Sequence, residues 1–207
     1  MNILIYTMSS PKPNGGGVSR MTYSISMGLQ KRGYHVFYLC FEKLVTDTPL
    51  ENLFYFPDLL DPKSLSNKKF LNSFIKEHTI GFIINQIPLN EAFSDILYEV
   101  KPKGVRIASV IHNSSLNLVR QFAYAKEYAL RKKRLSWLFY VIKSWPVKKA
   151  IIAAYICKHR NHYKKMEKGS DYIIAVSPKN IDDICTLIGF QSSKVIAISN
   201  FISVNDR

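Results

Sequence analysis

Three consecutive glycines near the start of the chain are the first candidates for a binding site. Gly15, Gly16 and Gly17 follow a short apolar run. A segment with helical periodicity begins near Val18, and Arg20 follows it closely. Free N–H groups at the N-terminus of a helix suit an anionic group such as a phosphate, and glycines leave one face of such a loop without side chains. The alternative is that the glycines only let the chain turn.

A second candidate is the polar pair that ends a later apolar run. His112 and Asn113 follow the stretch GVRIASVI, which predicts a buried strand. Side chains at the carboxyl end of a parallel strand lie at the edge where open sheets bind ligands. His112 could equally be a capping or packing residue. The other histidines show no metal-ligand spacing, so no metal is expected, and we expect His159 and His162 to face solvent or lipid headgroups.

Most of the positive charge lies in one segment. The formal net charge is +14, and residues 120–168 hold fourteen basic residues against two acidic ones. Aromatic residues lie between these cations, a composition that suits an anionic membrane surface. Nucleic acid and a plain solvated helix face are the alternatives, and nucleic acid is the less favoured because no such motif accompanies the charge. The expected membrane-contact residues are Arg131, Lys132, Lys133, Arg134, Trp137, Trp145, Lys148 and Lys149.

The composition is that of a globular protein. The 207 residues are 47% hydrophobic and 21% charged, which is enough for one large domain with a substantial core. Cys40, Cys157 and Cys185 are dispersed in apolar segments, so we expect buried free thiols and a reducing compartment. Neither a secretory signal nor a span of about 20 apolar residues is present in the sequence, and a cytoplasmic location is expected.

The elements that must position these residues alternate between strands and helices. Apolar runs predict about seven strands, namely Ile3–Tyr6, His35–Phe41, Asn52–Phe56, Ile80–Asn85, Gly104–Ile111, Ser170–Val176 and Lys194–Ser199. The segments between them predict helices from Val18 to Gly33, over Lys63–His78, Asn90–Val100 and about Leu118–Lys143, from Pro146 onward, and over Lys179–Ile188. This alternation predicts a doubly wound, Rossmann-like α/β domain over residues 1–207, with a mostly parallel sheet and helices on both faces. A basic helical segment at about 118–168 interrupts it.

Such a topology raises the question of a nicotinamide dinucleotide. The dinucleotide fingerprint G-x-G-x-x-G follows the first strand directly, and a later acid binds the ribose. Here about eight residues separate the predicted strand end from the glycines, and GGGVSR lacks the final glycine. Glu42, at the end of the second strand, could imitate the ribose-binding acid. The sequence alone therefore gives this hypothesis little support.

Several short motifs, in order, resemble the N-terminal domain of the GT-B glycosyltransferases, in particular the retaining group called family 4. The matching residues are Gly15–Gly17 with Arg20, the stretch Gly33–Val36, the strand that ends at His112, the segment Ser170–Ser177 and the strand that ends at Asn200. The resemblance covers essentially the whole chain. It implies that a C-terminal donor-binding domain, absent from these 207 residues, completes the enzyme.

That resemblance implies roles for particular residues. In the family the glycine loop approaches the donor diphosphate and the histidine faces the donor sugar, so Gly15, Gly16, Gly17, Arg20, His112 and Asn113 are expected to line the donor and acceptor cleft. No catalytic residue is assigned within this domain. No metal or other cofactor is expected, and the partners would be a nucleotide sugar and a saccharide or lipid-linked acceptor.

The function expected from the sequence is therefore that of the acceptor-side half of a retaining glycosyltransferase, inactive when isolated. It would act at the inner face of a bacterial cytoplasmic membrane in cell-envelope or capsular polysaccharide synthesis. One alternative is a non-catalytic α/β module that binds membrane or nucleic acid. A less favoured alternative is a nicotinamide-dependent Rossmann enzyme.

Overall fold

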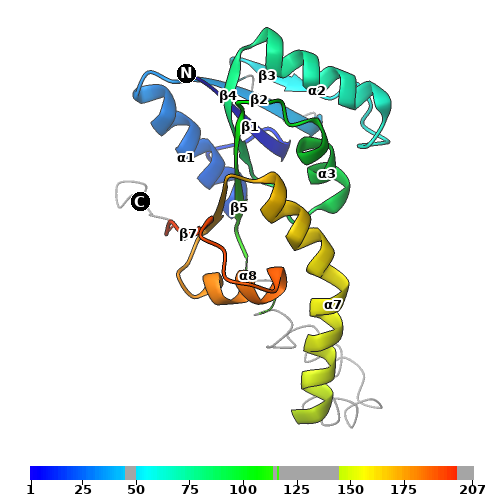
Figure 1. The fold of residues 1–207 in the computed structure, drawn as a ribbon. Helices are drawn as coiled ribbons and strands as arrows, with labels where there is room; N and C mark the ends of the chain where they lie inside the picture. Colours follow the sequence, from blue (N-terminus) through cyan, green and yellow to red (C-terminus); the bar gives the residue numbers. More distant parts are fainter. Residues whose placement is uncertain (45–49, 114–115, 117–144, 200–207) are drawn as a thin grey trace, which may run out of the picture.

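Seven strands of the described chain pair side by side in one fully parallel sheet (Figure 1). The computed structural model describes residues 1–44, 50–113, 116 and 145–199. The strands are β1 (Asn2–Ser9), β2 (His35–Glu42), β3 (Leu53–Tyr55), β4 (Ile80–Asn85), β5 (Arg106–Ile111), β6 (Tyr172–Ala175) and β7 (Val195–Ala197). The helices are α1 (Gly17–Lys31), α2 (Leu65–Glu77), α3 (Glu91–Val100), α7 (Trp145–Gly169) and α8 (Asn180–Ile188). The predicted Rossmann-like α/β class is confirmed.

The strand order is β3-β2-β1-β4-β5-β6-β7. The chain first moves from β1 outward to β3, then crosses to the other side of β1 and continues outward to β7. Since crossovers between parallel strands are right-handed, this reversal puts the two sets of helices on opposite faces. Accordingly α1 covers one face, and α2, α3, α7 and α8 lie on the other (Figure 1).

The hydrophobic core lies mainly between the sheet and the larger set of helices. One cluster joins β1, β2 and β4 to α2 and α3, and a second joins β5, β6 and β7 to α7 and α8. A small cluster on the other face includes Ile5, Val36 and Tyr38, with Leu29 of α1 against it. Because β1 and β2 are covered on both faces here, their sequences contain continuous apolar runs rather than alternating ones.

The first strand is longer than its apolar run predicts. β1 continues to Ser9 because Thr7 pairs with Cys40 and Ser9 pairs with Glu42, so backbone bonds to β2 extend the strand through polar residues. Only five residues, 10–14, then separate the strand from Gly15. The gap of about eight residues that weakened the dinucleotide hypothesis is therefore wrong.

One further expectation is wrong, and another concerns residues that the structure does not describe. Cys40 and Cys185 are buried free thiols, but Cys157 lies on an outward face of α7 and is exposed, so the expectation of three buried thiols is wrong for it. The predicted helix from Leu118 to Lys143 lies outside the described residues. Of the helices that the structure describes, none combines the length and apolar character needed to cross a membrane.

Candidate functional site at the carboxyl edge of the sheet

The site is the edge where β1 and β4 end side by side. The chain leaves β1 toward β2 and leaves β4 in the opposite direction toward β5, so the two connections diverge at this point of the sheet. Ligands of open parallel sheets bind outside the carboxyl ends of the strands at such a switch point. The segments that meet there are the glycine loop, the residues after β4 and the residues after β5.

The glycine loop leads into a helix whose N-terminus is open. α1 begins at Gly17, its cap residue Gly16 makes no side-chain cap, and its first turn contains no acidic residue. A Cβ atom at Gly16 or Gly17 would meet no described atom within 4 Å, so these positions leave room for a ligand close to the backbone. The free N–H groups and the positive end of the helix dipole favour an anion here.

Gly15 has a different role in the same loop. Its N–H donates to the carbonyl of Lys12 at 3.2 Å, and the Lys12 N–H donates to Ser19 Oγ at 2.9 Å. A Cβ atom at Gly15 would lie 2.5 Å from that Ser19 hydroxyl oxygen. Gly15 therefore folds the loop back onto the first turn of α1, and the other two glycines form the open surface.

A carboxylate stands beside the start of this loop. Glu42, the last residue of β2, pairs in register with Ser9, the last residue of β1, and its side chain is exposed. The acid therefore lies on the same edge as the open end of α1. A carboxylate at this place of a doubly wound sheet can accept hydrogen bonds from the hydroxyl groups of a ribose.

A hydrogen-bonded pair of side chains forms the other part of the site. His112, directly after β5, places Nε2 2.6 Å from Oε1 of Gln86, which directly follows β4. The ring nitrogen donates and the amide oxygen accepts, which leaves Nδ1 of the imidazole as an acceptor. Burial lowers the pKa of His112, so the neutral ring is favoured. With Asn113 and Val18 of α1, the pair lines a pocket of about 240 Å³.

The position of Gln86 is fixed by the end of β4. Its backbone N–H donates to the carbonyl of Tyr6 in β1 at 2.9 Å. Asn85 turns the following residues by accepting the Ile87 N–H at 3.0 Å, and its own amide donates to the Tyr98 hydroxyl at 3.3 Å. These contacts hold the end of β4 rigidly against β1 and α3.

Two buried polar atoms at this edge have no partner among the described residues. They are Nε2 of Gln86 and Oγ of Ser10, on residues that are 3% and 1% exposed. A buried donor without a partner costs about 1–3 kcal/mol relative to a paired one. Such atoms are rare in folded proteins and are expected where a ligand or water supplies the missing bond.

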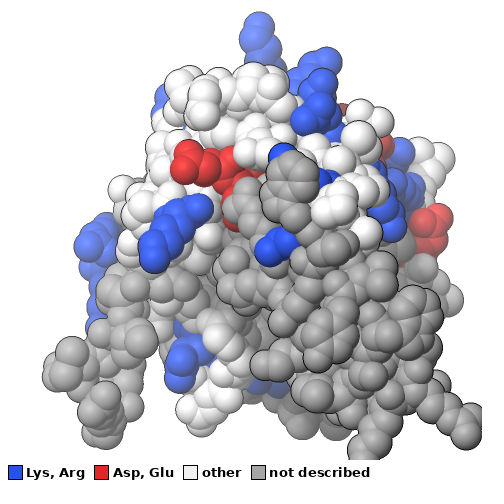
Figure 2. Space-filling view, turned by 90° about the horizontal axis from the view of Figure 1, so that it is seen from below, with Lys and Arg blue, Asp and Glu red and all other residues white. Residues whose placement is uncertain are grey.

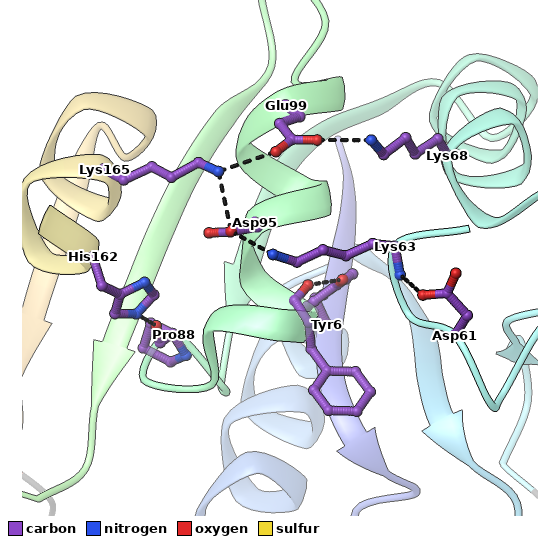
Figure 3. Close-up of polar contacts among 10 residues, drawn as sticks. Tyr6, Asp61, Lys63, Lys68, Pro88, Asp95, Glu99, His162 and Lys165 are labelled. Atoms are coloured by element: carbon purple, nitrogen blue, oxygen red, sulfur yellow. Dashed lines mark hydrogen bonds and ion pairs between the residues drawn. The ribbon is translucent and has the colours of Figure 1, made fainter. Parts of the chain in front are cut away.

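α7 supports the loop after β4 from the outside. His162 is 6% exposed, and its Nε2 donates to the Pro88 carbonyl at 2.7 Å (Figure 3). The expectation that His162 faces solvent or lipid headgroups is therefore wrong, because α7 packs across this loop. His159, one turn earlier, is half-buried, with Nδ1 4.0 Å from a carboxylate oxygen of Glu91. No group of histidine, cysteine and acidic residues suited to a metal ion occurs in the described part of the chain.

A long apolar groove adjoins this pocket on the α1 side of the sheet. Its volume is about 390 Å³. Met21 and Ile25 of α1 form one wall, and side chains from β4 to β7 form the floor. His112 and Val110 line both the groove and the smaller pocket. The imidazole therefore stands at their junction.

Of the site residues expected from the sequence, only His112 and Asn113 line the smaller pocket, and the three glycines line neither the pocket nor the groove. Val18, at the glycine-rich start of α1, shares a pocket with His112 and Asn113, but Arg20 is exposed and does not line it. Gln86 was missed, although a polar residue directly after a buried strand is a signal that could have found it. That it would face His112 depends on the strand order, which is a long-range property.

The expected membrane-contact residues are mostly outside the described residues. Arg131, Lys132, Lys133, Arg134 and Trp137 lie there, and so does the side chain of Trp145, although α7 begins at this residue. In the same helix Lys148 is half-buried and Lys149 is exposed. On the face shown in Figure 2, the described lysine and arginine side chains stand in several separate groups.

Comparison with known proteins identifies no family for this chain. No protein family and no curated protein sequence matches it. One solved structure with a similar fold is a dTDP-glucose 4,6-dehydratase from Bacillus anthracis in complex with NAD, with a TM-score of 0.40, 14% identity and coverage of 84% of this chain. The chain spans about half (53%) of that dehydratase. Another is a short-chain dehydrogenase from Leptospira borgpetersenii with bound NAD⁺, with a TM-score of 0.40, 11% identity and coverage of 96% of this chain and 91% of the other.

These findings correct the family and cofactor expected from the sequence. Both solved structures are NAD-containing enzymes and neither is a GT-B glycosyltransferase, so the glycosyltransferase function and the expectation of no cofactor are wrong. The capsular setting and the absent donor domain were implications of that resemblance and lose its support. The expected membrane contact was based on the basic segment as well and stays a prediction. At this level of similarity the two enzymes carry no inference about the activity of this chain.

The physical reason for the error is visible in the matched motifs. Gly33 ends α1 with a φ of 81°, which favours glycine, while Ile173 and Ala175 are fully buried in β6. The motifs therefore reflect turns and buried strands that a doubly wound sheet needs. They do not distinguish one family with this fold from another.

Proposed function

We propose that this chain is the nucleotide-binding domain of a nicotinamide-dependent enzyme. The observation that carries the proposal is the register of Ser9 with Glu42, at the carboxyl ends of β1 and β2 beside the switch point. It puts a carboxylate beside the loop that leads to the open N-terminus of α1. Ribose hydroxyls and a diphosphate of one dinucleotide require these two features side by side.

The residues fit such a ligand in other respects. Gly16 and Gly17 leave open space over the backbone N–H groups that would receive the diphosphate. Gln86 and His112 lie beyond the start of α1, where the nicotinamide end of a dinucleotide would extend. A nicotinamide ring held there would supply the redox chemistry. The contribution of the chain is to bind the phosphates and ribose, and to present the Gln86 amide and the neutral imidazole.

In the dinucleotide fingerprint the glycines follow the strand directly, whereas five residues, 10–14, separate β1 from Gly15 here. The chain also departs from the fingerprint at its third glycine. Arg20 stands there, and the glycine normally allows the helix to pack closely on the sheet. Arg20 is exposed, so it does not lie between α1 and the sheet. Small buried side chains, Thr22 and Ser26, face the sheet instead. Close packing is thus preserved by other residues, and Arg20 does not obstruct the proposal.

The test is calorimetric titration of the chain with NAD⁺ and NADP⁺. We expect NAD⁺ to bind, and NADP⁺ to bind at least about tenfold more weakly, because Glu42 would repel the additional phosphate. Glu42→Ala should weaken NAD⁺ binding by about tenfold, or about 1.4 kcal/mol, and reduce the preference between the two dinucleotides. ADP, which lacks the nicotinamide half, should bind more weakly than NAD⁺.

A matched control is Glu77→Ala. Glu77 is an exposed acid at the C-terminal end of α2, which leads into the amino end of β4 and so lies at the opposite edge of the sheet. Its replacement should leave NAD⁺ binding unchanged. The proposal is wrong if neither dinucleotide binds, or if the two alanine variants bind NAD⁺ equally well. Equal affinity for ADP and NAD⁺ would contradict its nicotinamide part.

A further inference from the structure

The apolar groove is an unusual feature for the face of a parallel sheet. Such sheets are normally covered on both faces by helices. Here α7 and α8 cover β6 and β7 on one face, while alternate residues of these strands point to the α1 side. Among the described residues nothing covers them fully: Tyr172 and Ile196 are more than a third exposed, and Ile198 is 53% exposed.

The chemistry of the groove excludes a polar ligand along most of its length. Its floor consists of side chains from four adjacent strands and from Ile198, which directly follows β7. They are Phe82, Ile84, Ala108, Val110, Tyr172, Ile174, Ile196 and Ile198. Three inter-strand steps of about 4.8 Å make this floor about 14 Å wide. The volume of about 390 Å³ is within the usual range of small-molecule sites. Transfer of a hydrocarbon group from water to such a surface is favourable by about 25 cal/mol per Å² of apolar area.

The polar end of the groove also restricts which ligand can bind. His112 stands at the carboxyl end, and its Nε2 is already used by Gln86. Gln86 lines the smaller pocket that adjoins the groove at His112, and its buried amide nitrogen lacks a partner among the described residues. An amide N–H donates, so the ligand atom that completes this pair is an acceptor, and a carbonyl or hydroxyl oxygen fits. Nδ1 of the neutral imidazole can accept from a hydroxyl group at the same place.

We infer that the groove and the Gln86–His112 pair together bind an apolar molecule with one oxygen-bearing end, such as a medium-chain ketone or secondary alcohol. The oxygen lies at the pair and the hydrocarbon part lies along β4 to β7 beneath α1. One ligand of this class satisfies the buried amide and covers the open apolar floor. As the substrate class of the enzyme, this inference rests on the proposed function; as a binding site, it rests on the described residues alone.

Titration with 2-undecanone tests the inference, with 2-butanone as the ligand that has the same oxygen and a short chain. We expect 2-undecanone to bind at least tenfold more tightly, since only its chain can fill the groove. Ile196→Lys should weaken 2-undecanone binding at least tenfold. The matched control is Leu60→Lys, because Leu60 is almost fully exposed and is not part of the groove.

Two further variants separate the two ends of the site. Ala108→Phe fills the middle of the floor and should also weaken 2-undecanone binding. Gln86→Leu removes the amide and should weaken both ketones by a similar factor of about three to ten. Ile196 is a partly exposed residue, so its lysine variant keeps the test valid if Ala108→Phe does not fold.

The inference is overturned if 2-undecanone binds no better than 2-butanone, or if Ile196→Lys binds it like the unaltered chain. It is also overturned if sedimentation shows a dimer that Ile196→Lys dissociates, since a second copy then covers the groove. Titration of the same samples with NAD⁺ distinguishes the two proposals. Loss of NAD⁺ binding alone contradicts the proposed function, and absence of 2-undecanone binding alone contradicts the inference.

Discussion

Gly15 and Gly17, two residues apart in one loop, differ in their tolerance of a side chain. A Cβ atom at Gly15 would lie 2.5 Å from Ser19 Oγ and 2.7 Å from Ser19 Cβ, whereas one at Gly17 would meet nothing within 4 Å. Gly15→Ala should therefore destabilise the fold by about 1–3 kcal/mol. Gly17→Ala, the matched control, should leave stability unchanged or raise it by up to about 1 kcal/mol. Urea denaturation measures both, and equal midpoints would contradict the role given to Gly15.

His112 makes stability depend on pH. Burial lowers its pKa in the folded state below the ordinary 6.5. As pH falls through 6.5 the unfolded chain takes up a proton that the folded chain does not, so the free energy of unfolding falls. The loss is complete below the folded pKa. His112→Gln should reduce the slope of stability against pH between about pH 7 and 5, measured by urea denaturation. An unchanged slope would show that His112 titrates alike in both states.

For single residues, the sequence indicates which side chains could bind a ligand better than it indicates where those side chains lie in the fold. The glycine loop and His112 could be selected because their types are unusual at strand ends. Gln86 could not be paired with His112, since their meeting depends on β4 lying next to β5. His162 was misjudged because its neighbours in sequence are basic, whereas its burial depends on Pro88, 74 residues away.

The helices on the larger face are joined by a network of charges centred on α3. Asp95 Oδ2 accepts from Lys63 at 2.8 Å and lies 3.1 Å from the ammonium nitrogen of Lys165 in α7 (Figure 3). Glu99 bridges the same Lys165 to Lys68 of α2 at 3.0 and 2.9 Å. Burial alone would raise the pKa of Asp95, but the two ammonium groups outweigh it and the pKa is lowered. α2, α3 and α7 are therefore held together electrostatically as well as by packing.

Asp95→Asn should destabilise the fold by about 1–2 kcal/mol, because Asp95 is 13% exposed and serves two lysines. The contribution of Asp95 is present above its ordinary pKa of 3.8 and is lost as pH falls toward the lower folded value. Lys68→Met breaks only an exposed pair and should cost less than about 0.5 kcal/mol. Thermal unfolding at pH 7 compares the two. A larger effect of Lys68→Met would contradict this ranking.

The elements themselves were largely predictable. Apolar runs bounded by glycine, proline and polar residues placed all seven strands, with ends that differ by up to three residues. The difference is largest for β1, whose polar end is a strand only because β2 pairs with it. The positions of α2 and α3 were equally predictable from the sequence. The charge network around α3 was not, because its ion pairs join residues 32 and 66 positions apart.

At the scale of the whole molecule, the strand order predicts where the sheet is most stable. β1 has a partner on both sides, while β3 and β7 are edges with three residues each. Edge strands open locally at low free energy, and central strands open mainly with global unfolding. Hydrogen exchange should therefore be slowest for the amides of Ile3–Tyr6 and fastest, among the strands, for β3 and β7. Equal protection across the sheet would contradict this order.

The fold class followed from the alternation of strands and helices, but the family and the open face of the sheet did not. Every doubly wound sheet imposes the same short motifs, so their order could not separate one family from another. Whether helices cover β4 to β7 on the α1 side depends on how the crossovers run. That property became visible only once the order of the strands was known.

The place of β1 between β2 and β4 has a consequence for how the chain is made. β2 is available to β1 as soon as residue 42 has been synthesised, but β4 ends only at residue 85. For the time needed to add those residues, β1, with its four buried apolar residues Ile3 to Tyr6, keeps a bare edge in the nascent chain. Such edges invite pairing with other chains. A chaperone that binds the first eighty residues as they leave the ribosome should therefore raise the yield of folded protein, measured by translation with and without it.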